Sequence, residues 1–322
     1  MKEQSGGDLL ERLGSDLSAA ILLCLDDPAD LVRLASLSKS WRIFVISNGF
    51  CKRLCLRTNP EISCFVRAIE VGGLSTTAVK KVGSNCSGQW HTMESEHRIF
   101  AYFGYRSVSS RFFTETGVES ISASNTNAML PGYLGPNMFS SFWSNKRKST
   151  LTFRLSCKLC VIHEIKIQLP QAEFYCRASK CRFRLGHMRN ENATPEELLA
   201  EDFIWTYVSP EFSMVEIGDF QSLKLQRPVV CIGGVLQFEL LSRDPSDESS
   251  DMRTLIMASR VKAIVCPLAP AFEVSLLDRM GDSILMYFPG AIPYLEDFFV
   301  QEPSFSSRRK FWRKAKRRRK NW

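Results

Sequence analysis

The stretch from residue 13 to residue 41 constrains the fold of this chain most strongly, because its apolar residues recur at the spacing of amphipathic helices. The first stripe is Leu17, Ile21, Leu22 and Leu25, and the second is Leu31, Leu34, Leu37 and Trp41. Ser15 and Asp16 are suited to cap the first helix, and Asp27-Pro28 is suited to begin the second. Two or three short helices cannot bury this much apolar surface alone, so the stretch predicts a module that a partner covers.

The order of residues in this stretch resembles the F-box, a small helical module that docks onto the Skp-type adaptor of cullin ubiquitin ligases. The matching positions are Leu13, Asp16-Leu17, Ile21-Leu22, Leu25, Asp27-Pro28, Asp30-Leu31, Leu34, Leu37 and Trp41-Arg42. The chain departs from the family pattern at Gly14, where Pro is usual, and at Ser38, where Cys is common. Glycine in place of proline makes the entry to the module less rigid. The alternative is an ordinary amphipathic helix pair that packs on its own domain.

The resemblance implies a docking surface on this module. The residues expected to bind the adaptor, or to form the core beneath it, are Leu13, Leu17, Ile21, Leu22, Leu25, Pro28, Leu31, Leu34 and Trp41. The sequence does not divide these residues between the two roles. The last helix of the module is expected to continue from Trp41 to the break at Asn59-Pro60.

Composition indicates a globular protein with two modest domains. The chain has 322 residues, of which 44% are hydrophobic, enough for packed cores. It contains no apolar run near the roughly 18–20 residues of a transmembrane helix. The first residues lack the basic and apolar regions of a signal peptide. The 11 cysteines are scattered and odd in number, so we expect reduced thiols in an intracellular protein.

The C-terminal segment is strongly basic. Ten Lys and Arg residues lie between residues 308 and 320, and without them the net charge of +8 falls to −2. The body is therefore not expected to present a nucleic-acid surface, whereas the segment itself is expected to be exposed and disordered. It resembles a nuclear-import signal through Arg308, Arg309, Lys310, Lys316, Arg317, Arg318, Arg319 and Lys320. Nucleic acid and an anionic membrane surface are alternative partners that we do not expect.

From residue 151 onward the periodicity becomes that of strands. Leu151, Phe153 and Leu155 alternate with polar residues, and the same parity continues through Cys157 to Val161. Further strands are expected at 162–167, 181–185, 204–208, 223–225, 235–241, 255–265 and 284–288. Residues 194–202 have a helical pattern, as do residues 88–104 before the strands. Many short strands without alternating helices favour an antiparallel sandwich or jelly roll.

The order of motifs in this half is similar to discoidin-type, galactose-binding-like jelly rolls. The motifs are Ser122-Ala123-Ser124, Phe142-Trp143-Ser144, residues 151–155, residues 162–167, Phe183 and residues 235–242. The chain also resembles plant F-box proteins that carry such a C-terminal half. The resemblance implies the fold but no sugar site, because the ligand loops of such folds vary freely. We expect Trp143 and Trp205 to contact a target.

These observations predict an α+β protein with a helical F-box module and an antiparallel β-sandwich. The expected divisions are a disordered N-terminus at 1–8, the F-box at 9–58, a helical connector at 59–116, the sandwich at 117–268, an extension packing on it at 269–300, and a basic disordered tail at 301–322.

Several patterns invite a metal or catalytic interpretation that we do not adopt. A zinc site would need Cys157 and Cys160 to converge with Cys176 and Cys181, yet no Gly or Pro lies close by to shape a zinc knuckle. The first two cysteines also fall on opposite parities of the expected strand. Buried thiols and no metal are therefore expected.

Other chemical motifs are also incomplete. There is no G-x-S-x-G motif, and Gly233-Gly234 lacks the Lys-Ser/Thr of a phosphate loop, so we expect those glycines to form a turn or bulge. The acidic residues at 244–251 depart from a calcium loop, and a solvated hairpin tip is expected there. We therefore expect no catalytic residue and no cofactor.

Our hypothesis is a non-catalytic substrate receptor of a cullin-type ubiquitin ligase. Its expected partners are a Skp-type adaptor and through it a cullin, a protein target and an import receptor, in the nucleus, the cytoplasm or both. Such a receptor acts by proximity, because it raises the effective concentration of the target near a ubiquitin-loaded enzyme. The alternative is a non-ligase sandwich that binds glycan or lipid and carries a vestigial F-box.

Overall fold

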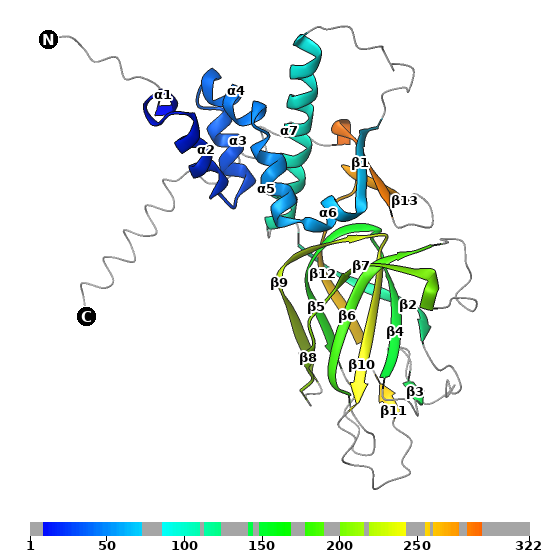
Figure 1. Cartoon of the computed structure of the whole chain (residues 1–322). Coiled ribbons are helices and arrows are strands. Elements are labelled where there is room, and N and C mark those ends of the chain that lie inside the picture. The colour runs from blue at the N-terminus through cyan, green and yellow to red at the C-terminus, as the bar shows by residue number, and fades with distance from the viewer. Residues whose placement is uncertain are drawn as a thin grey trace, which may run out of the picture.

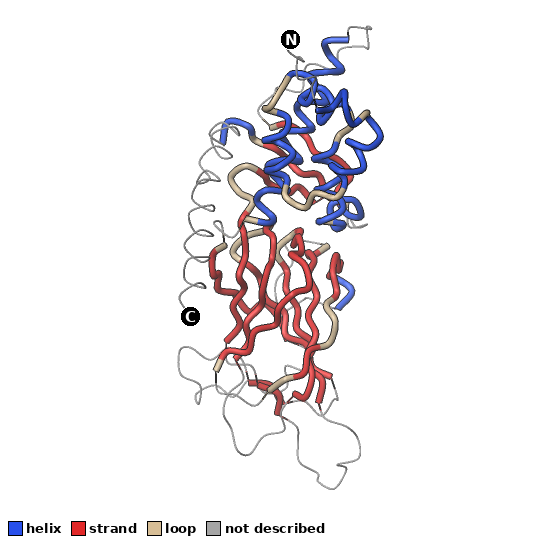
Figure 2. Tube along the Cα trace, turned by 90° about the vertical axis from the view of Figure 1, so that its left-hand side faces the viewer, coloured by secondary structure: helices blue, strands red, loops and turns tan. Residues whose placement is uncertain are grey.

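The computed structural model has a helical module and a β-sandwich at opposite ends of the molecule (Figure 1). A view turned by 90° shows the same separation of helices from most of the strands (Figure 2). The structure describes residues 9–72, 86–109, 113–123, 141–143, 148–168, 178–189, 200–215, 219–242, 255–257, 260–276 and 282–291. The fold class is α+β, as the sequence predicts.

Five short helices form the N-terminal part of the helical module. They are α1 (Leu9–Leu13), α2 (Ser15–Leu23), α3 (Pro28–Ala35), α4 (Lys39–Ser47) and α5 (Phe50–Thr58). The predicted cap at Asp27 is confirmed, because its Oδ1 accepts a hydrogen bond from the Ala29 N–H at 2.8 Å. The predicted caps at Ser15 and Asp16 are wrong, since the N-cap residue of α2 is Gly14, with a φ of 75°.

Two helix breaks after α3 differ from the prediction. The second apolar stripe is divided, because α3 ends at Ala35 and the Ser38 hydroxyl caps α4 by accepting a hydrogen bond from the Trp41 N–H at 3.2 Å. A further break lies at Gly49, whose φ of 61° favours glycine. Trp41 therefore lies on a different helix from Leu31, and α3 and α4 pack against each other.

The connector completes the helical module. It contains α6 (Pro60–Phe65), β1 (Val66–Val71) and α7 (Cys86–Val108). The helix expected at 88–104 is confirmed by α7. The connector was predicted to be helical throughout, but it also includes the strand β1. α7 packs along α3, α4 and α5. A Cβ at Gly104 would lie 2.8 Å from Pro28 Cγ, which explains how α7 approaches α3 so closely. Arg42 and Glu94 form an ion pair between α4 and α7.

Within the described ranges, nine antiparallel strands form the sandwich. They are β2 (Thr114–Ala123), β4 (Lys148–Leu155), β5 (Leu159–Gln168), β6 (Ala178–Met188), β7 (Phe203–Val208), β8 (Phe212–Ser213), β9 (Phe220–Ile232), β10 (Val235–Ser242) and β12 (Arg260–Pro267). Their order is β7-β6-β10-β4-β2-β12-β5-β9, with β8 on β6. Because β2 pairs with β4 on one side and β12 on the other, it joins the two layers. The predicted antiparallel sandwich is confirmed.

Alternate residues of both layers fill the space between them. Phe153, Phe183 and Phe238 belong to one layer, and Ile162 and Ile165 to the other, and all five are buried in one core. The strand expected at 151–155 is confirmed by β4, whereas the alternation expected to continue from Cys157 to Val161 is interrupted, because β4 ends at Leu155 and β5 begins at Leu159.

Gly233-Gly234 forms the predicted turn. The two residues connect β9 to β10 at φ values of 92° and 71°. A Cβ at Gly234 would lie 2.9 Å from the Cys157 carbonyl oxygen, and one at Gly233 would lie 2.1 Å from His187 Cβ. Glycine is therefore required both by the backbone conformation and by the close approach of the chain between β4 and β5.

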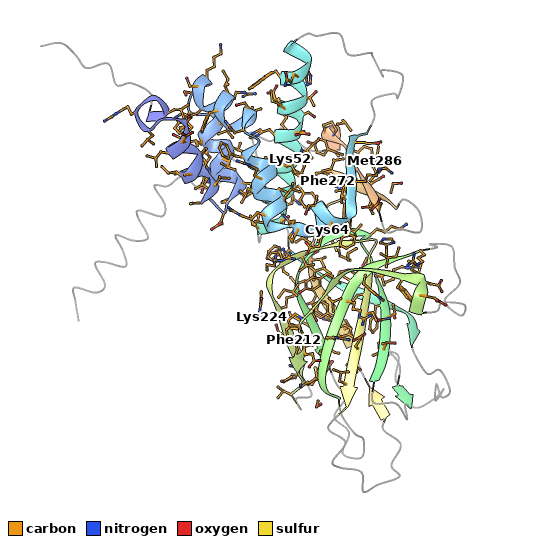
Figure 3. All side chains as sticks on the ribbon, viewed as in Figure 1. Lys52, Cys64, Phe212, Lys224, Phe272 and Met286 are labelled. Carbon is orange, nitrogen blue, oxygen red and sulfur yellow. The ribbon has the colours of Figure 1, made fainter. Side chains whose placement is uncertain are left out.

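A small sheet lies among the helices. β1 pairs in parallel with β14 (Ser283–Tyr287), which pairs antiparallel with β13 (Phe272–Leu276). Phe272, labelled in Figure 3, packs edge-on against Phe103 of α7 with ring centroids 5.3 Å apart. The described part of the 269–300 extension therefore joins β1 and α7, whereas the sequence predicted packing on the sandwich. A continuous core links this sheet to the helices and to the near ends of β5 and β9.

The remaining predictions concern short or undescribed segments. The strand expected at 255–265 is two strands, β11 (Leu255–Met257) and β12, and β11 pairs with β3 (Ser141–Trp143). Of the helix expected at 194–202, only a 3₁₀ turn at Ala200–Asp202 is described. Residues 1–8, 244–251 and 292–322 lie outside the described residues. Within the described ranges, no helix has the length and apolarity needed to span a bilayer.

Candidate functional sites

Large apolar side chains are exposed on the helical module. Of the eight large hydrophobic side chains that are exposed in the described part of the chain, five lie between residues 17 and 43. These five define the helical apolar face: Leu17, Ile21, Leu23, Leu37 and Ile43. Leu17 is 54% exposed and Leu37 is 71% exposed. A concentration of apolar surface on one short stretch is typical of a docking site for another protein.

The nine predicted docking residues divide into surface and core. Leu17 and Ile21 are exposed, and Leu13, Leu25 and Leu34 are half-buried. Four are buried by the chain itself: Leu22, Pro28, Leu31 and Trp41. Of the two roles that the sequence left open for these four residues, their burial favours the core beneath the docking surface. Trp41 packs edge-on against Phe44 with ring centroids 6.0 Å apart.

The residues expected to bind the adaptor do not include Leu23, Leu37 or Ile43. Trp41 and Val45 share the buried side of α4, since they lie four residues apart and are both buried. Ile43 lies midway between them and therefore points outward. The spacing of Trp41, Ile43 and Val45 is visible in the sequence. It predicts an exposed Ile43 only if the helix is known to begin at Lys39.

Arg57 holds the docking helices in place. Its guanidinium donates hydrogen bonds to the carbonyl oxygens of Leu23 and Leu25, and its Nη2 lies 3.1 Å from Asp26 Oδ1. These contacts satisfy carbonyl groups where α2 ends, which would otherwise lack partners. Arg57 thereby fixes the turn between α2 and α3, next to Ile21 and Leu23.

The structure does not bring together Trp143 and Trp205, the two tryptophans expected to contact a target. β3, which carries Trp143, lies at the end of the sandwich farthest from the helices, whereas β7, which carries Trp205, lies beside α6 (Figure 1). The Trp205 side chain is half-buried and stacks on Phe203, with ring centroids 5.3 Å apart and an interplanar angle of 16°. The guanidinium carbon of Arg184 lies 5.8 Å from the centroid of the Trp205 ring.

Trp205 borders a cationic surface on the outer side of β4, β10 and β6. The strand registers place Arg154, Val235, Gly186 and Trp205 in one row across the sheet. The next rows contain Thr152, Gln237 and Arg184, and then Thr150, Glu239 and Arg182. We call the set Arg154, Arg182, Arg184, Trp205 and Glu239 the arginine face.

Glu239 organises the arginine face from beneath. Its side chain is 1% exposed and forms ion pairs with Arg184 Nη2 at 2.6 Å and with Arg182 Nε. The side chains of Arg182 and Arg184 are 32% and 24% exposed, so both guanidinium groups reach the surface. A buried carboxylate that holds two arginines restricts their rotamers before any ligand binds.

Two cysteines of the sandwich form a buried thiol pair. Cys160 lies opposite Cys231 across β5 and β9, and both side chains are fully buried. The hydrogen bond between these thiols, together with burial, raises the pKa of Cys160 above its ordinary value. Burial raises the pKa of Cys181 to about 12. Among the described residues, no group of three or more His, Cys, Asp or Glu side chains is arranged to hold a metal ion.

Two further predicted features lie outside the described residues. Cys176, proposed as a zinc partner of Cys157, is one of them. The other is the basic tail with its import residues Arg308, Arg309, Lys310, Lys316, Arg317, Arg318, Arg319 and Lys320.

Comparison with solved structures returns domains of the discoidin-like, galactose-binding class. One is the family 32 CBM from C. perfringens NanJ in complex with galactose, at 11% identity and a TM-score of 0.32, covering 47% of this chain and 99% of that one. Another is the F5/8 type C domain of a Bacteroides fragilis protein, at 14% identity and a TM-score of 0.27, covering 50% of this chain and 97% of that one. The sandwich architecture itself is established by the strand pairings.

Comparison of the sequence identifies the family. No family model matches the chain. The chain is 32% identical over 313 residues to F-box protein At4g00755 of Arabidopsis thaliana, a match that covers 87% of this chain and 82% of that protein. This match includes both the helical module and the sandwich, since it extends over most of each sequence. The chain therefore belongs to the F-box proteins.

Proposed function

We propose that this chain is the substrate-recognition subunit of a Skp-cullin-F-box ubiquitin ligase. The observation that carries the proposal is the helical apolar face, which presents Leu17, Ile21 and Leu37 to solvent in a chain of the F-box family. This face docks a Skp-type adaptor, and the sandwich holds a target protein. Apolar side chains exposed to this extent are stabilised when a partner removes them from water.

The proposed mechanism is positioning, and it requires no catalytic residue in this chain. A receptor that binds the adaptor and the target together raises the effective concentration of target lysines near the ubiquitin-loaded enzyme. The geometry supports this role, because the docking helices and the sandwich share a continuous core. Glu61 of α6 also forms an ion pair with Arg227 of β9, with Arg227 Nη1 and Glu61 Oε2 3.2 Å apart. A rigid connection keeps a bound target at a fixed distance from the adaptor.

A pull-down of the full chain with a purified Skp-type adaptor tests the proposal. We expect the wild-type chain to retain the adaptor and the double variant Leu17→Asp, Ile21→Asp to lose it. Val215→Asp is the matched control, since Val215 is 52% exposed on the sandwich and its variant should bind normally. Failure of the folded wild-type chain to bind would contradict the proposal. Glycan or liposome binding by that same chain would then favour a non-ligase sandwich.

We further propose that the basic tail directs the chain to the nucleus. The proposal is supported by the run Lys316, Arg317, Arg318, Arg319 and Lys320 and by the smaller cluster at 308–310. Replacement of the five-residue run by glutamine should shift a fluorescent fusion from nucleus to cytoplasm. An unchanged distribution would contradict this role, and it would leave the adaptor proposal unaffected.

A further inference from the structure

We propose that the arginine face is the site at which the sandwich binds an acidic segment of a partner protein. The face lies on the outer side of β4, β10 and β6, which is turned toward the viewer in Figure 1. That this partner is a ubiquitylation target rests on the proposed function above. The binding site itself is inferred from the arrangement of the side chains.

The first argument is charge. The ionisable members of the face are three guanidinium groups and the Glu239 carboxylate, and Glu119 of β2 is the register partner of Arg154. Three positive and two negative charges leave one positive charge in excess. Arg154 is exposed, and its Nη2 lies 4.0 Å from the sulfur of Met188. No ion pair joins Arg154 to a carboxylate among the residues whose side chains the structure describes, and its register partner on β2 is Glu119. An acidic ligand would supply the missing negative charge.

The second argument is the geometry of the donors. Glu239 engages Nε of Arg182 and Nη2 of Arg184, so further N–H groups of both guanidinium planes remain for a second oxyanion. Arg184 is also held against the Trp205 ring. Two arginines fixed in this manner lose little rotamer entropy when they bind a carboxylate or phosphate group.

The third argument distinguishes a protein segment from a nucleic acid. The net charge of the chain without the ten Lys and Arg residues of the tail is −2, and the face contains a carboxylate at its centre. A nucleic-acid surface needs a longer uninterrupted row of cations to neutralise successive phosphates. A patch of three arginines with apolar neighbours is better matched to one or two acidic side chains of a peptide.

The test measures binding of fluorescein-labelled hexaglutamate to the full chain by fluorescence anisotropy. Because the basic tail would also attract this probe, all chains carry glutamine in place of Lys316, Arg317, Arg318, Arg319 and Lys320. We expect Arg154→Glu to weaken binding by about tenfold or more, since charge reversal replaces attraction by repulsion. Arg184→Lys should weaken it less, because the charge that Glu239 requires is retained while the planar fork is lost.

The matched control is Lys224→Glu, which reverses one exposed charge on β9 of the other layer (Figure 3). It should leave the affinity within about twofold, since it lies outside the proposed site. Thermal melting verifies that each variant is folded. Equal binding by the parent chain and Arg154→Glu would overturn the proposal, as would an equal loss in Lys224→Glu. A dependence on Arg154 seen only with a thymidine oligonucleotide would assign the face to nucleic acid instead.

A labelled peptide that contains phosphoserine, used in the same assay, distinguishes a phosphate from a carboxylate as the preferred oxyanion. No adaptor is present in these measurements. A negative result therefore removes the arginine face as a binding site and leaves adaptor docking to be judged by the pull-down.

Discussion

Burial decides what each apolar residue of the helical module contributes. Trp41 is 5% exposed and lies in the core, whereas Leu17 is 54% exposed on the surface. Both residues belong to the same F-box-like pattern, yet their substitution should have different effects. A buried side chain contributes to the stability of the fold, and an exposed one is available to a partner.

Trp41→Ala should lower the free energy of unfolding by about 3–5 kcal/mol, because it leaves a cavity in the helical core. Leu17→Ala should change it by less than about 0.5 kcal/mol, as is usual for a surface site. Urea unfolding followed by circular dichroism measures both values. Similar losses in the two variants would show that Leu17 is not at the surface.

His97 makes the stability depend on pH. Burial, together with the charges of Arg42 and Arg98, lowers the pKa of His97 to about 4. The unfolded chain takes up this proton near pH 6.5, so the folded state binds fewer protons between about pH 6.5 and pH 4. The stability that depends on neutral His97 is therefore fully present above about pH 6.5, and it is lost progressively as the pH falls toward about 4.

His97→Gln should reduce the pH dependence of the unfolding free energy by up to about 1.4 kcal/mol per pH unit within that window. Urea midpoints at pH 7.5, 6 and 5 measure the slope. His91→Gln, which changes an exposed histidine of the same helix, is the control. An unchanged slope in His97→Gln would contradict the assigned burial. His163, whose pKa is also lowered to about 4 by burial, would then have to account for the slope.

At the scale of single elements, backbone conformation decides where the helices begin. Gly14 precedes α2 with φ 75° and ψ 162°, a region that is accessible almost only to glycine. Its N–H donates a hydrogen bond to the Leu10 carbonyl at 3.0 Å. The proline that is usual in the family has no N–H and a φ near −65°, so it cannot adopt this conformation.

Gly14→Pro should therefore destabilise the module, by about 1–3 kcal/mol, although proline is the family's usual residue there. Gly14→Ala should cost less, since it keeps the N–H and adds only backbone strain. Thermal melting of the wild-type, Gly14→Pro and Gly14→Ala chains ranks their stabilities. A proline variant as stable as the wild type would show that the entry to α2 can rearrange, and that this φ is not required.

At the scale of the whole molecule, the helical module and the sandwich are joined by buried polar contacts as well as by apolar packing. The Glu61 side chain is 3% exposed, whereas that of its partner Arg227 is 39% exposed. Arg106 of α7 donates a hydrogen bond to the Pro267 carbonyl at the end of β12. These contacts join α6 and α7 to the sandwich strands.

The unequal exposure of the Glu61–Arg227 pair predicts an asymmetry. Arg227→Met should lower the free energy of unfolding by about 2–4 kcal/mol, because Glu61 is left charged and buried. Glu61→Gln should cost less, since the exposed guanidinium of Arg227 is hydrated when its partner is gone. Urea unfolding measures both variants, and the continuous core predicts a single transition in each. Equal costs would mean that Glu61 is reached by water.

Local patterns were sufficient to predict the helical module, the strand-rich half and the family, because amphipathic periodicity and the order of motifs can be read from short stretches of the chain. Asp27-Pro28 marked a helix start, and Leu151, Phe153 and Leu155 marked an inward strand face, as the structure confirms. Gly233-Gly234 marked a turn, which the structure also confirms. The contacts that require glycine there, with the end of β6 and with the segment between β4 and β5, come from distant parts of the chain.

Packing in three dimensions sets which apolar residues face solvent and where the C-terminal strands lie. Leu22 and Ile21 are neighbours in one stripe, but the packing of α2 on α5 buries the first and leaves the second exposed. Pairing of β14 with β1 joins segments more than 200 residues apart, which no local pattern encodes. Burial is a property of the surfaces that meet in space, and the residues that meet are set by the whole chain.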